Sequence, residues 1–161
     1  MRRQDREITD RAEIDWLLGQ AKVCRVAFAV GDRPYIVPLS PGYDAEANVL
    51  FFHTARDGRK IDCIEANPRV CFEVEGTAEV KAGDERGCSW SVRYESAIGY
   101  GTMVELVSPA ERDHALRFIM RQQAGREADW VFTPEMLDAT RVWRLAIDSV
   151  TGKRSFPLQD G

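Results

Sequence analysis

The sequence predicts a mainly β protein, in which one antiparallel sheet curls toward a barrel and three or four helices flank it. Segments with the alternation and Val/Phe-rich composition of strands recur at hairpin spacing, and they amount to six or seven strands. Helical patterns interrupt them without a regular strand–helix–strand repeat, which excludes a Rossmann-type fold. The longest strand pattern covers residues 89–107, where Gly99 and Gly101 favour a bend or bulge that lets a sheet curl.

Composition indicates a single domain over residues 1–161. With 44% apolar and 30% charged residues, a chain of this length can bury a sizeable core, and it contains no internal repeat or linker. The net charge of −4 argues against a general nucleic-acid binder. Neither a signal peptide nor a run of about 18 apolar residues is present, so we expect a cytoplasmic protein without a membrane partner.

The N-terminal element is a helix that Thr9 or Asp10 can cap, with an apolar stripe at Ile14, Leu17 and Leu18 that would cover a core. The elements expected along the chain are helix 11–20, strands 23–30, 34–40 and 48–55, helix 58–66, strands 68–76, 77–83 and 89–107, helix 109–123, a short helix after Thr133, and strand 141–153.

The first two strands form a hairpin around Gly31-Asp32. Pro38, inside the second of them, has no N–H to donate to a neighbouring strand. It therefore lies at a sheet edge, at a bulge, or where the backbone faces a ligand, and an ordinary edge strand is the favoured interpretation.

The next strand ends at His53, after a polar turn at residues 43–48. Alternation places His53 on the same face as Val49 and Phe51, so the ring could simply be a satisfied core histidine. Its position just before the basic turn described next favours a functional role instead.

Residues 51–60 read FFHTARDGRK, a strand followed by a turn and the start of a helix. Asp57 is a candidate N-cap, and Asn67-Pro68 ends the helix. Arg59 and Lys60 then stand at the N-terminus of the helix, where positive side chains oppose the macrodipole and an anion would be stabilised. Arg, Lys and the small Gly58 together suit a phosphate. A solvated basic turn is the alternative.

The remaining elements have simpler patterns. Val70, Phe72 and Val74 alternate inward, a weaker strand follows, and residues 84–88 form a loop. Ser108 to Glu111 form a capping box with Pro at the first helical position of helix 109–123. His114 on that helix is expected at the surface.

The chain has four cysteines, at positions 24, 63, 71 and 88, without CxxC or CxxH spacing. We expect reduced, mostly buried thiols and no metal site. Glycine-rich nucleotide motifs, HExxH and GxSxG are also absent, so the phosphate interpretation depends on Arg59 and Lys60.

The order of the blocks IVPL, FFHTARDGRKID, NPRVCFEV, SVRYESAIGYGTMVEL and VWRLAIDSVTGK resembles the FMN-binding split-barrel superfamily of pyridoxamine 5′-phosphate oxidases. The resemblance is specifically to its branch of nitroimidazole-resistance (Nim-type) flavoproteins, and it covers roughly residues 8–156. It implies a six-stranded antiparallel split β-barrel that dimerises and holds FMN at the subunit interface.

The resemblance also implies roles for individual residues. Arg59 and Lys60, beside Gly58, would bind the FMN phosphate, and the backbone of Val37, Pro38 and Leu39 would lie along the isoalloxazine ring. Further contacts would come from His53, Thr54 and Ser96, the last from the long strand of the same chain or of the other subunit. His53 is the candidate catalytic residue.

These roles predict an FMN-dependent oxidoreductase that passes electrons to a small organic acceptor, for example a nitroaromatic. A flavin module that stores or senses FMN without turnover is the alternative, and a haem or deazaflavin in the same cleft is a third. The tail after Phe156 lacks the Arg-rich substrate-binding ending of true pyridoxamine-phosphate oxidases, which argues against vitamin B6 oxidation. The variable loop at residues 82–88 carries no substrate information.

Overall fold

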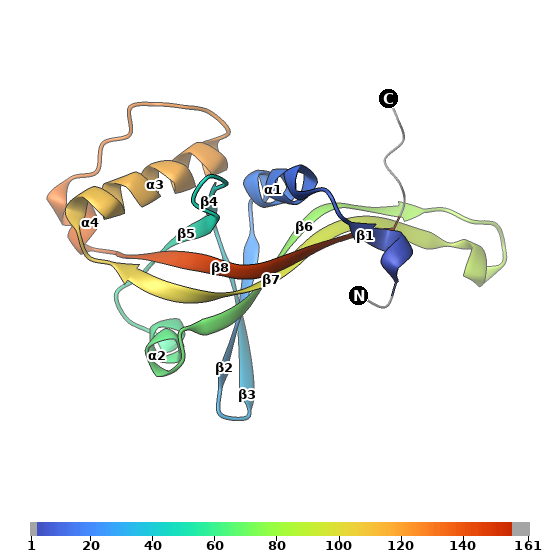
Figure 1. The fold of residues 1–161 in the computed structure, drawn as a ribbon, viewed down its shortest axis with the longest axis horizontal. Helices are drawn as coiled ribbons and strands as arrows, with labels where there is room; N and C mark the ends of the chain where they lie inside the picture. Colours follow the sequence, from blue (N-terminus) through green and yellow to red (C-terminus); the bar gives the residue numbers. More distant parts are fainter. Residues whose placement is uncertain (1–2, 156–161) are drawn as a thin grey trace.

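The computed structural model describes residues 3–155, and these form one antiparallel sheet with flanking helices (Figure 1). The strands are β1 (Glu7–Ile8), β2 (Cys24–Val30), β3 (Arg33–Leu39), β4 (Gly42–Asp44), β5 (Val49–Thr54), β6 (Arg69–Lys81), β7 (Ser91–Leu106) and β8 (Arg141–Arg154). The helices are α1 (Arg11–Gln20), α2 (Arg59–Ala66), α3 (Pro109–Ala124) and α4 (Pro134–Asp138), with short 3-10 turns at Gln4–Arg6 and Gly87–Ser89.

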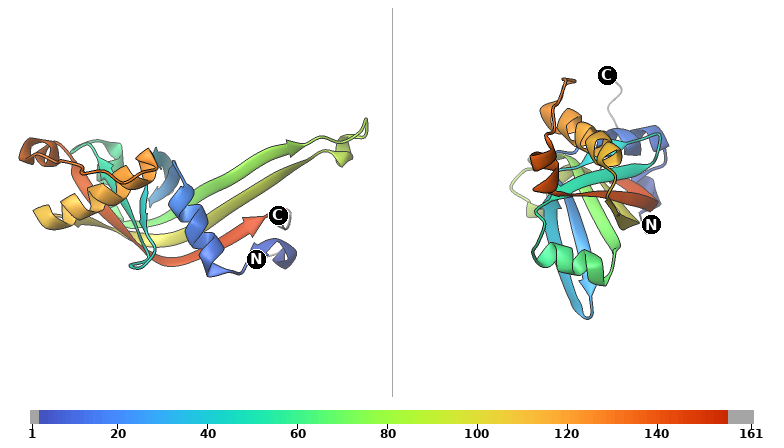
Figure 2. Two further views of the ribbon diagram at one scale, coloured as in Figure 1. Left: turned by 90° about the horizontal axis from the view of Figure 1, so that it is seen from above. Right: turned by 90° about the vertical axis from the view of Figure 1, so that its left-hand side faces the viewer.

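The strand order is β3-β2-β6-β7-β8-β5-β4, with β1 paired to β8 outside this path. Every neighbouring pair is antiparallel, as the hairpin spacing predicted. The sheet curls strongly, with α1 and α3 on one side and α2 beside the turn end of the β2–β3 hairpin (Figure 2). The mainly β, barrel-like fold class is therefore confirmed.

The described residues contain eight strands, two more than the six expected, because the short β1 and β4 add to six long ones. Strand β4 lies partly in the stretch predicted as a polar turn. The predicted strands 68–76 and 77–83 are one continuous strand, β6, with a bulge between Glu75 and Ala78. Gly76 lies at this bulge, where a Cβ would press against the Leu17 side chain. A glycine inside an alternating pattern can mark a bulge as well as a turn.

Two hydrophobic clusters hold the elements together. The larger fills the inside of the curled sheet under α1, and Phe28, Phe52 and Phe72 are its largest fully buried side chains. The smaller lies between α3 and the outer side of β5 and β8, and includes Phe51 and Ile119. Helix α1 covers the core as expected from its apolar stripe.

Only some of the helix caps that the sequence predicts are present in the structure. The Asp10 carboxylate accepts a hydrogen bond from the Ala12 amide at 2.9 Å and caps α1. The capping box predicted at Ser108 is wrong, because its side chain makes no capping bond. Pro109 at the first position of α3 has no N–H, which removes one donor that a cap would satisfy. Helix α2 is discussed below.

Candidate functional site

The N-terminus of α2 presents its cations and its backbone without a side-chain cap. Gly58, not the predicted Asp57, is the N-cap residue, and it adopts φ 123°, a conformation that glycine tolerates. The Gly58 carbonyl accepts the Ile61 amide at 2.7 Å, which closes the first turn. A Cβ built on Gly58 would meet nothing within 4 Å, so the space beside this turn is open.

The Arg59 side chain links this turn to the sheet. Its guanidinium lies over the ring of Tyr35 on β3, with 4.3 Å between Cζ and the ring centroid. Such a cation–π contact orients the side chain without consuming its N–H donors. Arg59 is exposed and Lys60 is half-buried, so both remain accessible to an anion in solution.

Strand β3 is at one end of the sheet path, so the prediction that Pro38 belongs to an edge strand is confirmed. Pro38 pairs with Arg25 of β2 and its side chain is exposed, whereas Val37 packs on the core and Leu39 is buried. The segment Val37 to Leu39 therefore has one edge free of a strand partner, among the described residues.

His53 lies at the end of β5, paired with Val142 of β8. Phe51 on the same face is buried under α3, but the helix does not extend over His53, which reaches solvent. Partial burial lowers the pKa of His53 below its ordinary value, and the positive charge of Lys60 lowers it further. The histidine and the cationic turn are thus within electrostatic reach of each other.

The Thr54 side chain makes its hydrogen bonds inside the protein and is not exposed at the surface. It is buried, accepts a hydrogen bond from Trp143 Nε1 at 3.0 Å, and donates one to the Ala55 carbonyl at 2.8 Å. Its hydroxyl has no free capacity to donate to a ligand, so only the Thr54 backbone remains available.

Ser96 is not brought beside Arg59 within one chain. Tyr35, which carries the Arg59 side chain, lies in a row across the sheet that reaches Val70 of β6. Ser96 is paired with Glu75, five residues farther along β6, which corresponds to about 17 Å along an antiparallel strand.

One residue that the sequence analysis missed, Arg141, fixes α2 to the sheet. Its Nη1 donates to Glu65 of α2 at 2.7 Å, and its Nε donates to Glu105 of β7 at 2.8 Å. The guanidinium also lies over the ring of Trp143, the residue that donates to Thr54. A single arginine at the start of a strand carries no motif, so only the three-dimensional structure identifies this role.

Other candidate sites are not supported within residues 3–155. No group of three or more His, Cys, Asp or Glu side chains could hold a metal ion there, and no helix there is long and apolar enough to cross a membrane. All four cysteines are free. Cys24 and Cys63 are buried as expected, Cys71 is half-buried, and Cys88 near the tip of the long hairpin is exposed, contrary to the expectation. His114 is exposed on α3, as predicted. The tail after Phe156 lies outside the described residues.

Comparisons with known proteins show which proteins share the sequence pattern and the fold. A family model described as pyridoxamine 5′-phosphate oxidase matches residues 10–154. A structure from Bacteroides thetaiotaomicron, proposed to be a 5-nitroimidazole antibiotic resistance protein, is 28% identical with a TM-score of 0.80, covering 92% of this chain and 86% of that one. No curated protein sequence matches the chain.

Two more distant structures share the fold. The FAD and heme binding protein from Mycobacterium smegmatis is 23% identical with a TM-score of 0.76, covering 97% of this chain and 76% of that one. The flavocytochrome Anf3 from Azotobacter vinelandii is 16% identical with a TM-score of 0.79, covering 99% and 75%. Because the family model spans nearly the whole chain, this protein belongs to the pyridoxamine 5′-phosphate oxidase family.

Proposed function

We propose that the protein binds FMN and acts as an oxidoreductase on a small organic acceptor. The observation that carries this proposal is the open N-terminal turn of α2, formed by Gly58, Arg59 and Lys60, where the charge of Lys60 acts on His53. The proposal also agrees with the family and with the flavin named for two of the similar structures.

The residues present fit a phosphate ester. Two cations and an uncapped helix N-terminus supply the positive potential and donors that a phosphate dianion requires, and the glycine leaves room for its oxygens. Arg59 and Lys60 would hold the phosphate. The partner-free edge at Val37 to Leu39 offers main-chain groups to a planar ring system.

When bound, the flavin supplies the electron transfer, and the side chains bind, orient and manage protons. His53 is the group placed to exchange a proton near the cofactor. Its lowered pKa leaves the imidazole mostly neutral at pH 7. A phosphate beside Lys60 would offset that positive charge and raise the pKa of His53 again, which favours the protonated form that a donor needs.

The proposal includes a homodimer, because Ser96 is far from Arg59 in the same chain. A second copy that faces the first could bring its own Ser96 to the site. Exposed apolar side chains on the outer face of the sheet, Ile36, Ile98 and Tyr100, support such an interface. Sedimentation should show a two-fold species, and a monomer with full FMN affinity would contradict the proposal.

The first experiment is the visible spectrum of the purified protein, followed by reduction with NADH or NADPH without air. Flavin absorption that bleaches supports the proposal, and chromatography of the released cofactor separates FMN from FAD. A haem spectrum, or no uptake of added FMN, would refute it.

Storage of FMN without turnover is the alternative, favoured by the lowered pKa of His53, which makes the imidazole a poorer proton carrier near neutral pH. His53→Gln separates the two, with His114→Gln as the matched control on the exposed face of α3. For an enzyme, His53→Gln should bind FMN nearly normally but reduce a nitroaromatic acceptor at least about tenfold more slowly per bound flavin. Wild-type turnover no faster than free FMN would instead indicate storage.

A further inference from the structure

A cavity lies on the outer side of the sheet, beside the first two turns of α3. The helix crosses β5 and β8 there (Figure 1), and the cavity has a volume of about 450 Å³. Cavities that bind small organic molecules have volumes of roughly 300–1,000 Å³. None of the residues assigned to the flavin lines this cavity. The cavity is therefore a candidate site for a ligand of its own.

The walls of the cavity are mainly apolar. Val49 and Phe51 of β5, Leu106 at the end of β7 and Ala110 of α3 form them. Three of these side chains also belong to the hydrophobic cluster under α3, so the cavity opens at the edge of a packed core. Such walls favour a ligand with an apolar ring, because the ring and the walls then remove each other from water.

Arg144 of β8 lies in this apolar setting without a partner. Its cross-strand neighbours are Phe51 and Val104, and its neighbours on the same face of β8 are Val142 and Ala146. The Arg144 side chain is exposed, and no hydrogen bond or ion pair joins it to any other residue that the structure describes. The contacts of the fold therefore do not account for a cation at this position.

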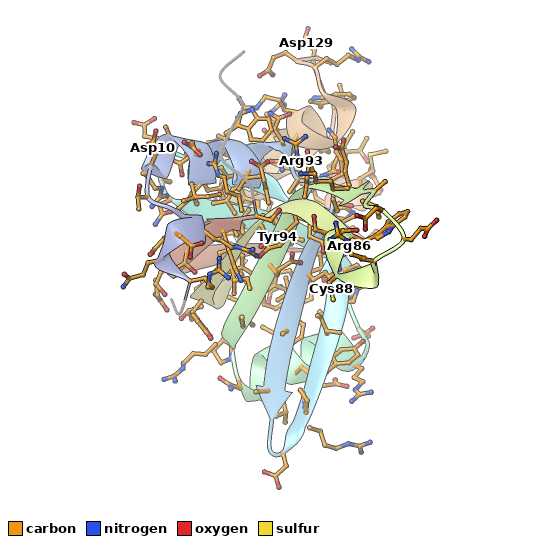
Figure 3. The ribbon with its side chains drawn as sticks, turned by 90° about the vertical axis from the view of Figure 1, so that its right-hand side faces the viewer. Asp10, Arg86, Cys88, Arg93, Tyr94 and Asp129 are labelled. Atoms are coloured by element: carbon orange, nitrogen blue, oxygen red, sulfur yellow. The ribbon has the colours of Figure 1, made fainter. Side chains whose placement is uncertain are left out.

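Other exposed arginines hold carboxylates. Arg117 on α3 donates to Asp113 at 2.7 Å. Even at the tip of the β6–β7 hairpin, Arg86 donates to Asp84 at 3.0 Å (Figure 3). Arg144 has the same N–H donors but no carboxylate to receive them. Its donors are therefore available to an anion from solution.

The two carboxylates beside the cavity have other roles. Asp44 accepts two backbone amides of its own turn at 3.0 and 3.1 Å, and its second oxygen lies 4.0 Å from His114 Nε2. Glu111 is in the first turn of α3, where the helix dipole stabilises a negative charge. Both groups serve the local structure, which leaves Arg144 as the charge that would select a ligand.

We propose that this cavity binds a small aromatic carboxylate, with its carboxylate on Arg144 and its ring against Phe51 and Leu106. The planar guanidinium offers two parallel N–H groups that match the two carboxylate oxygens. A carboxylate carries a single charge and suits a site with one cation, whereas a phosphate ester, with a charge of about −1.5 to −2, would need a second one. This site goes beyond the proposed function, because it involves neither the flavin nor His53.

The two histidines of the chain give a separate readout for each site. His114 borders this cavity, and His53 is at the proposed flavin site. In NMR titrations, cinnamate should shift the His114 imidazole signals to saturation and leave His53 unchanged. The neutral cinnamamide should bind about fivefold more weakly, and inorganic phosphate should leave His114 unchanged. Equal binding of cinnamate and cinnamamide, or a shift of His53 instead of His114, would overturn the proposal.

Two substitutions should change the affinity in opposite directions. Arg144→Gln should weaken cinnamate binding about fivefold and leave cinnamamide binding unchanged. Glu111→Gln should strengthen cinnamate binding by about twofold, because it removes a repulsive charge. Arg117→Gln is the matched control, since Arg117 is held by Asp113 and does not line the cavity.

Equal cinnamate affinity of wild type and Arg144→Gln would overturn the site. Weaker cinnamate binding by Glu111→Gln would also overturn it, because that result indicates a cationic or zwitterionic ligand. Circular dichroism of each variant checks that the fold is retained.

This site and the proposed function can fail independently. Saturation with FMN should leave the cinnamate affinity unchanged, since the cavity contains no residue assigned to the flavin. Competition between FMN and cinnamate would place the carboxylate in the flavin site and overturn the separate cavity. A protein that binds no FMN still tests the cavity, because the NMR readout needs no cofactor.

Discussion

Removal of the α2 cations should weaken FMN binding without affecting riboflavin, which has the same ring system but no phosphate. Lys60→Ala removes a half-buried charge, and Arg59→Ala removes an exposed one. Charge-assisted hydrogen bonds contribute about 1.5–3 kcal/mol, which corresponds to roughly a 10- to 100-fold loss of affinity for each substitution. Arg59 should be nearer the lower end, because solvent and salt screen an exposed charge.

The ratio of the FMN and riboflavin dissociation constants isolates the phosphate contact. Arg59 also contacts the Tyr35 ring, so its loss could shift the end of β3 and change binding of the flavin ring. Such a shift would affect both ligands and cancel in the ratio. The ratio of the FMN dissociation constant to the riboflavin dissociation constant should therefore rise for Arg59→Ala and Lys60→Ala, measured by fluorescence titration at fixed ionic strength.

Arg56→Ala is the matched control for this experiment. It removes the same charge three residues before Arg59, but the Arg56 guanidinium donates to the Asp138 carbonyl at 2.6 Å and is held by α4. Its FMN-to-riboflavin ratio should stay within about twofold of wild type. Equal ratios for wild type, Arg59→Ala and Lys60→Ala would refute the assignment of the phosphate to this turn.

Three further results are expected. In NMR titrations of the two imidazoles, inorganic phosphate should raise the pKa of His53 in the wild type but not in Lys60→Ala, with His114 as internal reference, and an unchanged His53 would separate it from the anion site. Replacement of all four cysteines by serine should leave the FMN spectrum intact, because none has a metal or redox arrangement, and loss of flavin from a folded variant would contradict this. Gly99→Ala should cost about 1–3 kcal/mol in the free energy of unfolding by denaturant, because its Cβ would overlap an aromatic ring and a backbone carbonyl, whereas Gly87→Ala, with open space, should be near neutral.

The sequence predicted the fold class and most element positions because alternation and helical spacing are local properties. It misplaced the boundary within β6, since Gly76 in an alternating pattern marks a turn and a bulge equally well. It also missed β4, whose three residues pair with β5 and lie under α3. Pairing of so short a segment depends on what packs against it, and no local pattern encodes that.

For the site, the sequence identified the residue types but not their surroundings. Arg59 and Lys60 at a helix start are visible as a pattern, and the structure confirms the helix. Thr54, by contrast, has its hydroxyl occupied by Trp143, a residue 89 positions away. The bonds of Arg141 to Glu65 and Glu105 are equally invisible in the sequence, because both require the sheet to bring distant segments together.

The stability of α2 depends both on its uncapped N-terminus and on a long-range contact at its other end. A helix with two cations and no cap at its N-terminus is locally unfavourable, so something else must hold it in place. Arg141 does so from the other end, because its bond to Glu65 anchors the last turn of α2 to β7 and β8. The positive end of the helix is therefore free to remain open while the helix stays fixed. This division, with the anchor at one end and the open cationic turn at the other, is the arrangement that a reversible anion site beside His53 requires.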